Sequence, residues 1–195
     1  MGARSRTAAL LALLLAPGPL LGAQEKPRSV SPAQNRERVL GIARQIVSGA
    51  RFCTMVTIGD LGQPQARVVD PLDPDPALVV YVATNPLSRK VGEIRRDPRV
   101  TLLYFDPARS AYVTLIGRAD EVPNPEKAAH RKKDWDAFFP ADKPEAYILY
   151  RIVPSRVEVV SAKDGLSGDP ATWRPEIVDL TASDGAAFPR KIEER

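Results

Sequence analysis

The sequence is poor in residues that build disulfides and metal centres, and it has no strong excess of one charge. It contains a single cysteine, Cys53, so an intramolecular disulfide and a cysteine-rich metal site are excluded. It contains a single histidine, His130, which excludes a metal centre with several histidine ligands. The formal net charge of +4 over 195 residues is too small to indicate a strong field for nucleic acids. We therefore expect neither a bound metal nor a nucleic-acid partner.

Long apolar runs are lacking as well. Near the start of the chain, two arginines precede the apolar residues 8–16, prolines interrupt the run, and small residues lead to the polar Gln24. This order is typical of a secretory signal peptide, and the run is too short for a stable membrane span. We expect residues 1–23 to be a signal peptide cleaved near Ala23, and the mature protein to be secreted or periplasmic. An N-terminal anchor is the alternative, whereas a lipoprotein would need a cysteine where Gln24 stands.

The remaining chain shows many short strand patterns and few helical ones. Apolar residues at helical spacing predict a helix over residues 31–48. Two β-rich stretches, 52–58 and 65–69, flank a glycine-containing turn and predict a hairpin. Asn124 and the proline after it predict the start of a second helix over the 127–138 region. Further strands are predicted at residues 78–83, 100–105, 112–116, 147–153 and 157–160.

These strands do not alternate regularly with helices, which argues against a doubly wound parallel sheet. A mainly β, antiparallel fold with flanking helices is favoured, and closure into a barrel would remove exposed strand edges. We expect an N-terminal helix region at 24–50, a barrel at 51–161 and a C-terminal arm at 162–195 that lies over the surface.

A strand-to-helix junction carries the clearest functional signal. The strand before it ends near Thr84, and Asn85 and Pro86 predict the cap and the first residue of a helix. Residues 88–90, Ser-Arg-Lys, then lie in the first helical turn. Free backbone N–H groups and the positive end of the helix dipole already lie there.

Two cations at this end of a helix are unfavourable unless an anion lies among them. A phosphate would relieve the repulsion, because it accepts bonds from the backbone, from Ser88 and from the side chains of Arg89 and Lys90. Arg67, on the preceding strand, supplies a further fork of donors. The alternative is that Arg89 and Lys90 are simply solvated.

Five segments carry a recognisable pattern in a fixed order: residues 67–69, 84–90, 97–105, 112–119 and 151–158. The most specific, Thr84-Asn-Pro-Leu-Ser-Arg-Lys90, resembles the T-N-x-x-S-R-K element of the pyridoxamine 5'-phosphate oxidase family. Segment 67–69 resembles the start of the family's R-x-V-x-x-K strand, and segment 151–158 resembles its closing R-V-x-P-x-x-V-E strand. The region 135–140 is similar to the general stress protein branch of the family.

The resemblance implies a mainly β fold with flanking helices, a six-stranded antiparallel split β-barrel of the FMN-binding type. It also implies a homodimer with FMN at the interface between the subunits. The implied cofactor-binding residues are Arg67, Ser88, Arg89 and Lys90 for the phosphate, Val68, Val69, Ala83 and Thr84 for the ribityl chain and ring, Tyr112 as a weaker candidate near the ring, and Arg174 from the other subunit.

The substrate end of the family's site is not matched. Leu72 stands where the oxidases place a lysine for the substrate phosphate, and the R-L-H-D-R element near their C-terminus is absent. Val159 and Val160 replace an aromatic residue after the closing Val-Glu. We therefore expect an FMN-dependent oxidoreductase that acts on a small redox substrate other than pyridoxamine phosphate. The alternatives are a non-catalytic protein that binds or stores a flavin, a deazaflavin or haem, and a cofactor-free dimer.

Other residues receive simpler interpretations. Cys53 is expected to be a buried apolar filler, and His130 a solvated surface residue. Glu93 is assigned to a solvated helix face. The aromatic residues Trp135, Phe138 and Phe139 are expected to pack in the core or at a dimer contact, with a substrate platform as the alternative. Trp173 lies in a loop region, where binding residues concentrate, and is a minor candidate.

Overall fold

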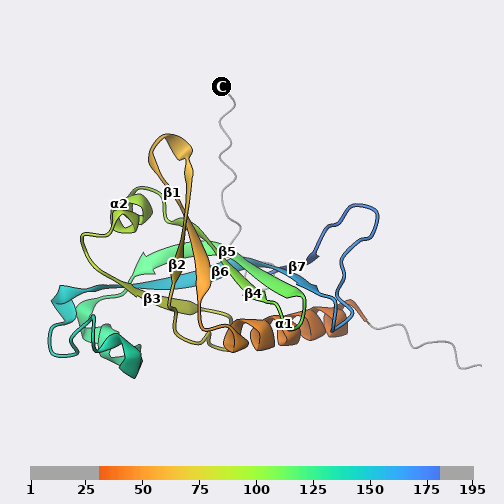
Figure 1. Ribbon diagram of the computed structural model, residues 1–195, viewed down its shortest axis with the longest axis horizontal. Helices are drawn as coiled ribbons and strands as arrows, with labels where there is room; N and C mark the ends of the chain where they lie inside the picture. Colours follow the sequence, from red (N-terminus) through yellow and green to blue (C-terminus); the bar gives the residue numbers. More distant parts are fainter. Residues whose placement is uncertain (1–30, 181–195) are drawn as a thin grey trace, which may run out of the picture. The chain divides into compact units, whose positions relative to one another are not determined.

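The computed structural model describes residues 31–180. One antiparallel sheet dominates this part of the chain (Figure 1). Six strands follow the order β2-β1-β4-β5-β6-β3 and curl into a half-barrel, and a seventh strand, β7, pairs with β6. The strands are β1 Cys53–Ile58, β2 Pro64–Val69, β3 Val80–Thr84, β4 Arg99–Asp106, β5 Ala111–Glu121, β6 Ile148–Ser161 and β7 Glu176–Asp179. The mainly β, six-stranded antiparallel split barrel predicted from the sequence is confirmed.

Residues 1–30 and 181–195 lie outside the described residues. The predicted signal peptide (1–23) and the last part of the predicted C-terminal arm therefore fall there. None of the helices within residues 31–180 combines the length and the apolar character that a membrane crossing requires.

The first helix, α1 (Pro32–Gly49), begins where the sequence predicts. Ser31 caps it in a reciprocal box with Gln34, each side chain bonding to the other residue's backbone N–H. Its apolar face packs against β4, β5, β6 and β7, where it covers one side of the main core (Figure 1). The buried residues of this face are Val39, Leu40, Ala43, Ile46 and Val47.

Strict alternation in the strands builds the main core. In β1, every second residue from Cys53 is buried, and β5 shows the same period from Ala111. Cys53 is the expected apolar filler, and burial raises the pKa of its thiol to about 12. The thiol is therefore protonated and unreactive at neutral pH.

A single long strand, β6, replaces the two strands predicted at 147–153 and 157–160. Pro154 does not end it, because a bulge places Ser155 as an extra residue opposite β5. The Ser155 hydroxyl donates to the Ile116 carbonyl at 3.1 Å. At the bulge the chains approach so closely that a Cβ on Gly117 would lie 2.1 Å from the Val153 carbonyl oxygen. One strand thus pairs with β5 along its length, with β3 at its start and with β7 near its end.

The predicted helix over 127–138 is wrong. The region instead forms short 3-10 turns, η2 (Asn124–Ala129) and η3 (Lys133–Trp135), followed by η4 (Pro144–Ala146). Tertiary contacts outweigh helical propensity here. Lys127 is buried, and its ammonium donates to the carbonyls of Pro144 and Tyr147 at 2.8 and 2.5 Å.

The same segment builds a second, smaller core. Two cations lie close to the Tyr147 ring, with Lys127 Nζ 4.8 Å and Arg131 Cζ 5.4 Å from its centroid. Buried around it are Val122, Trp135 and Leu149. This cluster packs against the start of β6, apart from the main core under α1.

The C-terminal arm contains a strand that the sequence pattern did not predict. β7 has four residues and pairs with β6 from Arg156 to Val159. The pattern is too short to be recognised without its partner strand.

We expect Gly117→Ala to destabilise the protein by about 2–3 kcal/mol, because the added methyl group would overlap backbone atoms of β6. Urea unfolding followed by tryptophan fluorescence measures the change. Gly41→Ala is the matched control, since no atom lies within 4 Å of a Cβ at this α1 position. It should stabilise the protein by about 1 kcal/mol. Equal effects of the two substitutions would contradict the bulge geometry.

Candidate functional site

The site lies where β3 leads into α2 (Arg89–Arg96), beside the β1–β2 hairpin. The predicted cap at Asn85 and helix start at Pro86 are wrong, because the Asn85 side chain accepts a bond from the Leu87 N–H at 2.8 Å and forms a turn. The helix begins at Arg89, with Ser88 as the N-cap residue. Arg89 and Lys90 still lie in its first turn, as predicted.

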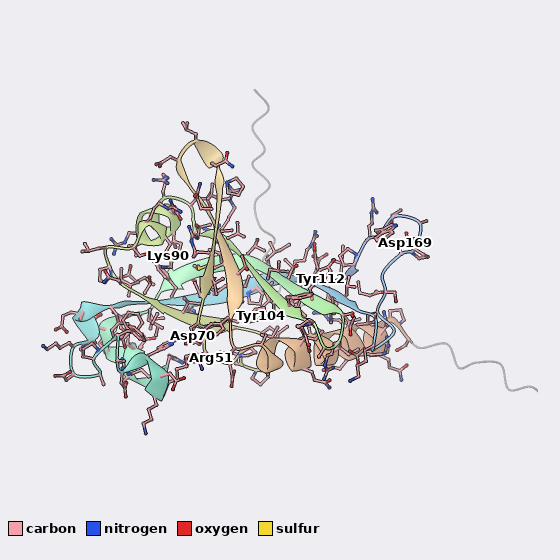
Figure 2. All side chains as sticks on the ribbon, viewed as in Figure 1. Arg51, Asp70, Lys90, Tyr104, Tyr112 and Asp169 are labelled. Carbon is pink, nitrogen blue, oxygen red and sulfur yellow. The ribbon has the colours of Figure 1, made fainter. Side chains whose placement is uncertain are left out.

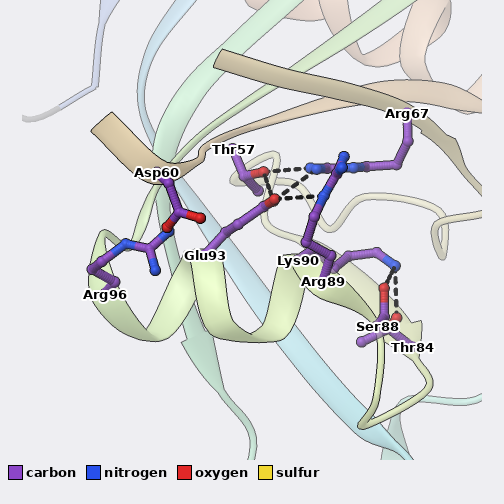
Figure 3. Close-up of polar contacts among 9 residues, drawn as sticks. All are labelled: Thr57, Asp60, Arg67, Thr84, Ser88, Arg89, Lys90, Glu93 and Arg96. Carbon is purple, nitrogen blue, oxygen red and sulfur yellow. Dashed lines mark hydrogen bonds and ion pairs between the residues drawn. The ribbon is translucent and has the colours of Figure 1, made fainter. Parts of the chain in front are cut away.

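Lys90 hydrogen-bonds to two hydroxyl groups at the junction of β3 and α2. Its Nζ lies 2.7 Å from Thr84 Oγ1 and 2.8 Å from Ser88 Oγ (Figure 3). Burial lowers the pKa of Lys90, the neighbouring Arg67 lowers it further, and Glu93 acts in the opposite direction. An ammonium group has three donors, so the two bonds to hydroxyls leave one for a ligand.

A buried carboxylate connects the other cations, which makes the predicted solvated position of Glu93 wrong. Its side chain is 4% exposed. One carboxylate oxygen, Oε2, accepts from Arg67 Nη2 at 2.7 Å and from Thr57 Oγ1 at 2.5 Å. The other, Oε1, lies 2.8 Å from Arg89 Nε. Arg67 Nη1 also donates to Thr57 Oγ1, which closes a triangle of bonds (Figure 3).

The charges and hydrogen bonds around Glu93 keep it ionised. Burial alone would raise its pKa, but the bonds from Thr57 and Arg67 and the charges of Arg67 and Arg89 outweigh this, so the pKa is lowered. The residues Thr57, Arg67, Thr84, Ser88, Arg89, Lys90 and Glu93 are called the corner below. With three cations and one carboxylate, the corner carries a net positive charge.

A groove of about 310 Å³ opens beside the corner. Its walls come from β2, from β3 and the start of α2, and from the segment around η3. The lining residues are Arg51, Val68, Val69, Asp70, Ala83, Thr84, Asn85, Lys90, Asp134, Trp135, Phe138 and Phe139. An ion pair between Arg51 and Asp134, 2.9 Å long, joins the hairpin side to the η3 side.

The η3 side is an aromatic wall, and its residues differ in burial. Trp135 is 3% exposed and meets the Phe139 ring edge-on, with centroids 6.3 Å apart, so the expected packing role is confirmed for it. Phe138 is 77% exposed although it lines the groove. Its ring therefore offers apolar surface to a ligand in the groove.

The structure brings together eight of the ten predicted cofactor-binding residues. Val68, Val69, Ala83, Thr84 and Lys90 line the groove, and Arg67, Ser88 and Arg89 belong to the corner. Tyr112 and Arg174 are not brought to the groove of the same chain. Figure 2 shows Tyr112 far along the sheet from Lys90. Tyr112 lies on β5 between Phe105 and Val160, and Arg174 is exposed in the loop before β7.

Sequence reasoning missed five residues of this region. Thr57 and Glu93 belong to the corner, and Arg51, Asp70 and Asp134 to the groove. A signal for Glu93 was present, because it follows Arg89 by four residues, the spacing of an ion pair along a helix. The contact of Arg51 with Asp134 spans 83 positions and has no local signal.

A second hollow, of about 220 Å³, is lined by Tyr81 of β3 and by Asp120, Glu121, Glu126 and Arg151, among others. His130 stacks on Tyr81 there, with ring centroids 3.8 Å apart. His130 is half-buried, so it lies at the surface as predicted, with one face of its ring packed on Tyr81 of β3. Within residues 31–180, no group of three or more histidine, cysteine or carboxylate side chains is arranged to hold a metal ion.

The antiparallel half-barrel with its cationic strand-to-helix corner and adjoining groove places the molecule among the split-barrel proteins. Residues 42–161, more than half of the chain, match the pyridoxamine 5'-phosphate oxidase family, and the chain belongs to that family.

Solved structures include relatives of general stress protein 26. A protein from Clostridium acetobutylicum, related to that of Bacillus subtilis, is 16% identical, with a TM-score of 0.61 over 74% of this chain and 96% of the other. General stress protein 26 from Bacillus anthracis is 21% identical, with a TM-score of 0.57 over 75% and 98%. An FAD-binding protein from Mesorhizobium loti is 19% identical, with a TM-score of 0.50 over 60% and 91%. These likenesses show the fold alone. None of the curated proteins matches the chain.

We expect two of the groove aromatics, Trp135 and Phe138, to differ in what they contribute to stability. Trp135→Ala should destabilise the protein by about 3–5 kcal/mol, since it empties a buried site. Phe138→Ala should change stability by less than about 0.5 kcal/mol, because its ring is exposed. Chemical unfolding followed by circular dichroism checks both. A large loss in the Phe138 variant would mean that its ring is packed and not available to a ligand.

Proposed function

We propose that the protein binds FMN, with the phosphate held in the corner and the rest of the cofactor in the groove, and that it works as a flavin-dependent oxidoreductase. The observation that carries the proposal is the convergence of Arg67, Arg89 and Lys90 at the start of α2, beside a groove lined by the predicted residues. Membership in the pyridoxamine 5'-phosphate oxidase family supports it. So does the fold shared with an FAD-binding protein.

The donors of the corner fit a phosphate. Lys90 retains one N–H for a ligand, and Arg89 is held through Nε, so its two terminal amino groups are available in a side chain that is 70% exposed. The hydroxyl groups of Thr84 and Ser88 and the positive end of α2 lie beside them. Charge-assisted bonds to a dianion are stronger than neutral ones, so this set favours a phosphate over an uncharged group.

Bound FMN would supply the electron or hydride transfer, and the chain would bind and orient it. The substrate is proposed to be a small redox molecule other than pyridoxamine phosphate. Leu72, at the position of the oxidases' lysine, packs against the second core and offers no charge to a substrate phosphate.

We propose a homodimer that covers the outer face of the sheet. One register row crosses this face from Val68 on β2 through Thr54, Leu103, Thr114 and Glu158 to Ile177 on β7. Val68, Leu103 and Ile177 in the row, and Phe105 beside it, are exposed apolar residues. Exposed apolar residues gathered on one face, here interspersed with Thr54, Thr114 and Glu158, favour an interaction surface.

The proposed dimer face also includes or adjoins Tyr112 and Arg174, the two predicted residues that lie away from the groove of their own chain. Tyr112 lies on it, paired with the exposed Phe105, and Arg174 lies three residues before Ile177. Since Val68 lines the groove at one edge of the face, a second copy would bring its own residues to the groove. Export directed by residues 1–23 to a secreted or periplasmic location is part of the proposal and rests on the sequence pattern.

Titration of the purified protein with FMN, riboflavin, FAD and haem tests the cofactor. We expect FMN to bind most tightly, and Arg89→Ala/Lys90→Ala to weaken FMN binding by about 2–4 kcal/mol. Arg95→Ala/Arg96→Ala, at the far end of α2, removes the same charge and should have little effect. Wild-type affinity in the Arg89/Lys90 variant would refute the corner as the phosphate site. Bleaching by NADH or NADPH with turnover of an acceptor indicates an enzyme, and bound FMN that is never reduced indicates a binding or storage protein.

Light scattering tests the dimer. We expect a mass of two chains, and Phe105→Arg should give monomers with weaker FMN binding, because a charge on the outer face opposes its burial. Leu61→Arg, an exposed apolar residue at the hairpin tip, is the control and should remain dimeric. A monomeric wild-type protein that binds FMN would separate the cofactor proposal from the dimer.

A further inference from the structure

We infer that Glu93 is a positioning residue for the phosphate: its buried carboxylate holds Arg67 and Arg89 in the arrangement that receives the anion. The inference rests on the proposed function and deepens it. A carboxylate beside an anion site opposes the ligand by its charge, so its presence in the corner requires an explanation.

The bonds of Glu93 order two cations from two elements. Oε2 accepts a bond of 2.7 Å from Nη2 of Arg67, which lies on β2. Oε1 lies 2.8 Å from Nε of Arg89, which lies on α2 (Figure 3). Each oxygen thus serves one guanidinium group. For Arg89 the contact uses Nε and leaves both terminal amino groups for a ligand.

Thr57 completes this support from a third element. It is fully buried on β1, donates to Glu93 Oε2 at 2.5 Å and accepts from Arg67 Nη1. Both terminal nitrogens of Arg67 are therefore fixed, one by Glu93 and one by Thr57. Without Glu93, the positive charges of Arg67, Arg89 and Lys90 would repel one another in the ligand-free protein.

The two possible roles of Glu93 predict opposite changes in phosphate affinity when its negative charge is removed. If the carboxylate only neutralised the cations, replacing it with an amide would make the corner more positive and tighten phosphate binding. If it positions them, the same change weakens phosphate binding in spite of the added positive charge. An amide cannot accept on both sides, because its nitrogen is a donor and would face another donor, either Arg67 or Arg89.

Glu93→Gln decides between these roles. The measured quantity is the ratio of the dissociation constants for riboflavin and FMN, which isolates the phosphate, because riboflavin lacks only that group. We expect the preference for FMN to fall about tenfold, the loss of one charge-assisted contact. A purely structural defect would weaken both ligands alike and leave the ratio unchanged. An unchanged or increased ratio overturns the inference.

Thr57→Val is the second variant, and it decides the matter if Glu93→Gln does not fold. It keeps every charge of the corner and removes only the hydroxyl group, so the preference for FMN should fall about threefold. An unchanged ratio in a folded Thr57 variant overturns the inference as well. Glu121→Gln is the charge control, since Glu121 pairs with Arg95 at 3.2 Å, at the far end of α2, and its ratio should equal that of the wild type.

The wild-type ratio separates this inference from the proposed function. If the wild type does not prefer FMN to riboflavin, the phosphate site itself is wrong and both proposals fail. If the wild type prefers FMN and the Glu93 and Thr57 variants keep that preference, only the positioning role fails.

Discussion

The corner depends on one buried carboxylate that two guanidinium groups share. Glu93 bonds to Arg67 of β2 and Arg89 of α2, and Thr57 of β1 joins them. The two strands of the hairpin and α2 are thereby held together by charge as well as by packing. The Glu93 carboxylate is buried, so loss of Arg67 would leave its charge desolvated and strongly destabilise the corner. The polar contact of Glu93 therefore acts together with the apolar packing of Val91 and Ile94 in placing α2 beside the hairpin and the groove.

The long strand β6 joins several elements of the sheet, as Glu93 joins those of the corner. It pairs antiparallel with β5 on one edge and with β3 and β7 on the other, and the bulge at Ser155 lies between the segments that pair with β3 and with β7. On one side of the sheet this arrangement encloses the main core. On the other it leaves the row from Val68 to Ile177, which starts at the groove and ends beside the C-terminal loop.

Much of the barrel could be predicted from the sequence, because alternation and turn residues are local signals. The hairpin and the helix that ends at Gly49 follow such signals directly. Local signals failed where distant contacts decide the structure. Lys127 bonds to the carbonyls of Pro144 and Tyr147, and its segment forms 3-10 turns in place of the predicted helix. Glu93 points inward because its carboxylate bonds to Thr57 and Arg67. The corner was predictable as a cluster of cations, but its internal counter-charge was not.

The second core has a consequence for how such a molecule can change. The contacts of the Tyr147 ring with Lys127 and Arg131 anchor the segment that carries the aromatic wall, and this anchor shares no residue with the main core. The side of the groove opposite β2 and β3 thus has a foundation of its own. Exposed residues on that side, such as Phe138, can be exchanged without removing a contact of the corner, while the Arg51–Asp134 ion pair still joins the two sides. The architecture thus separates one side of the groove, which would bind the same anionic group in every case, from the other side, whose exposed residues can vary with the substrate.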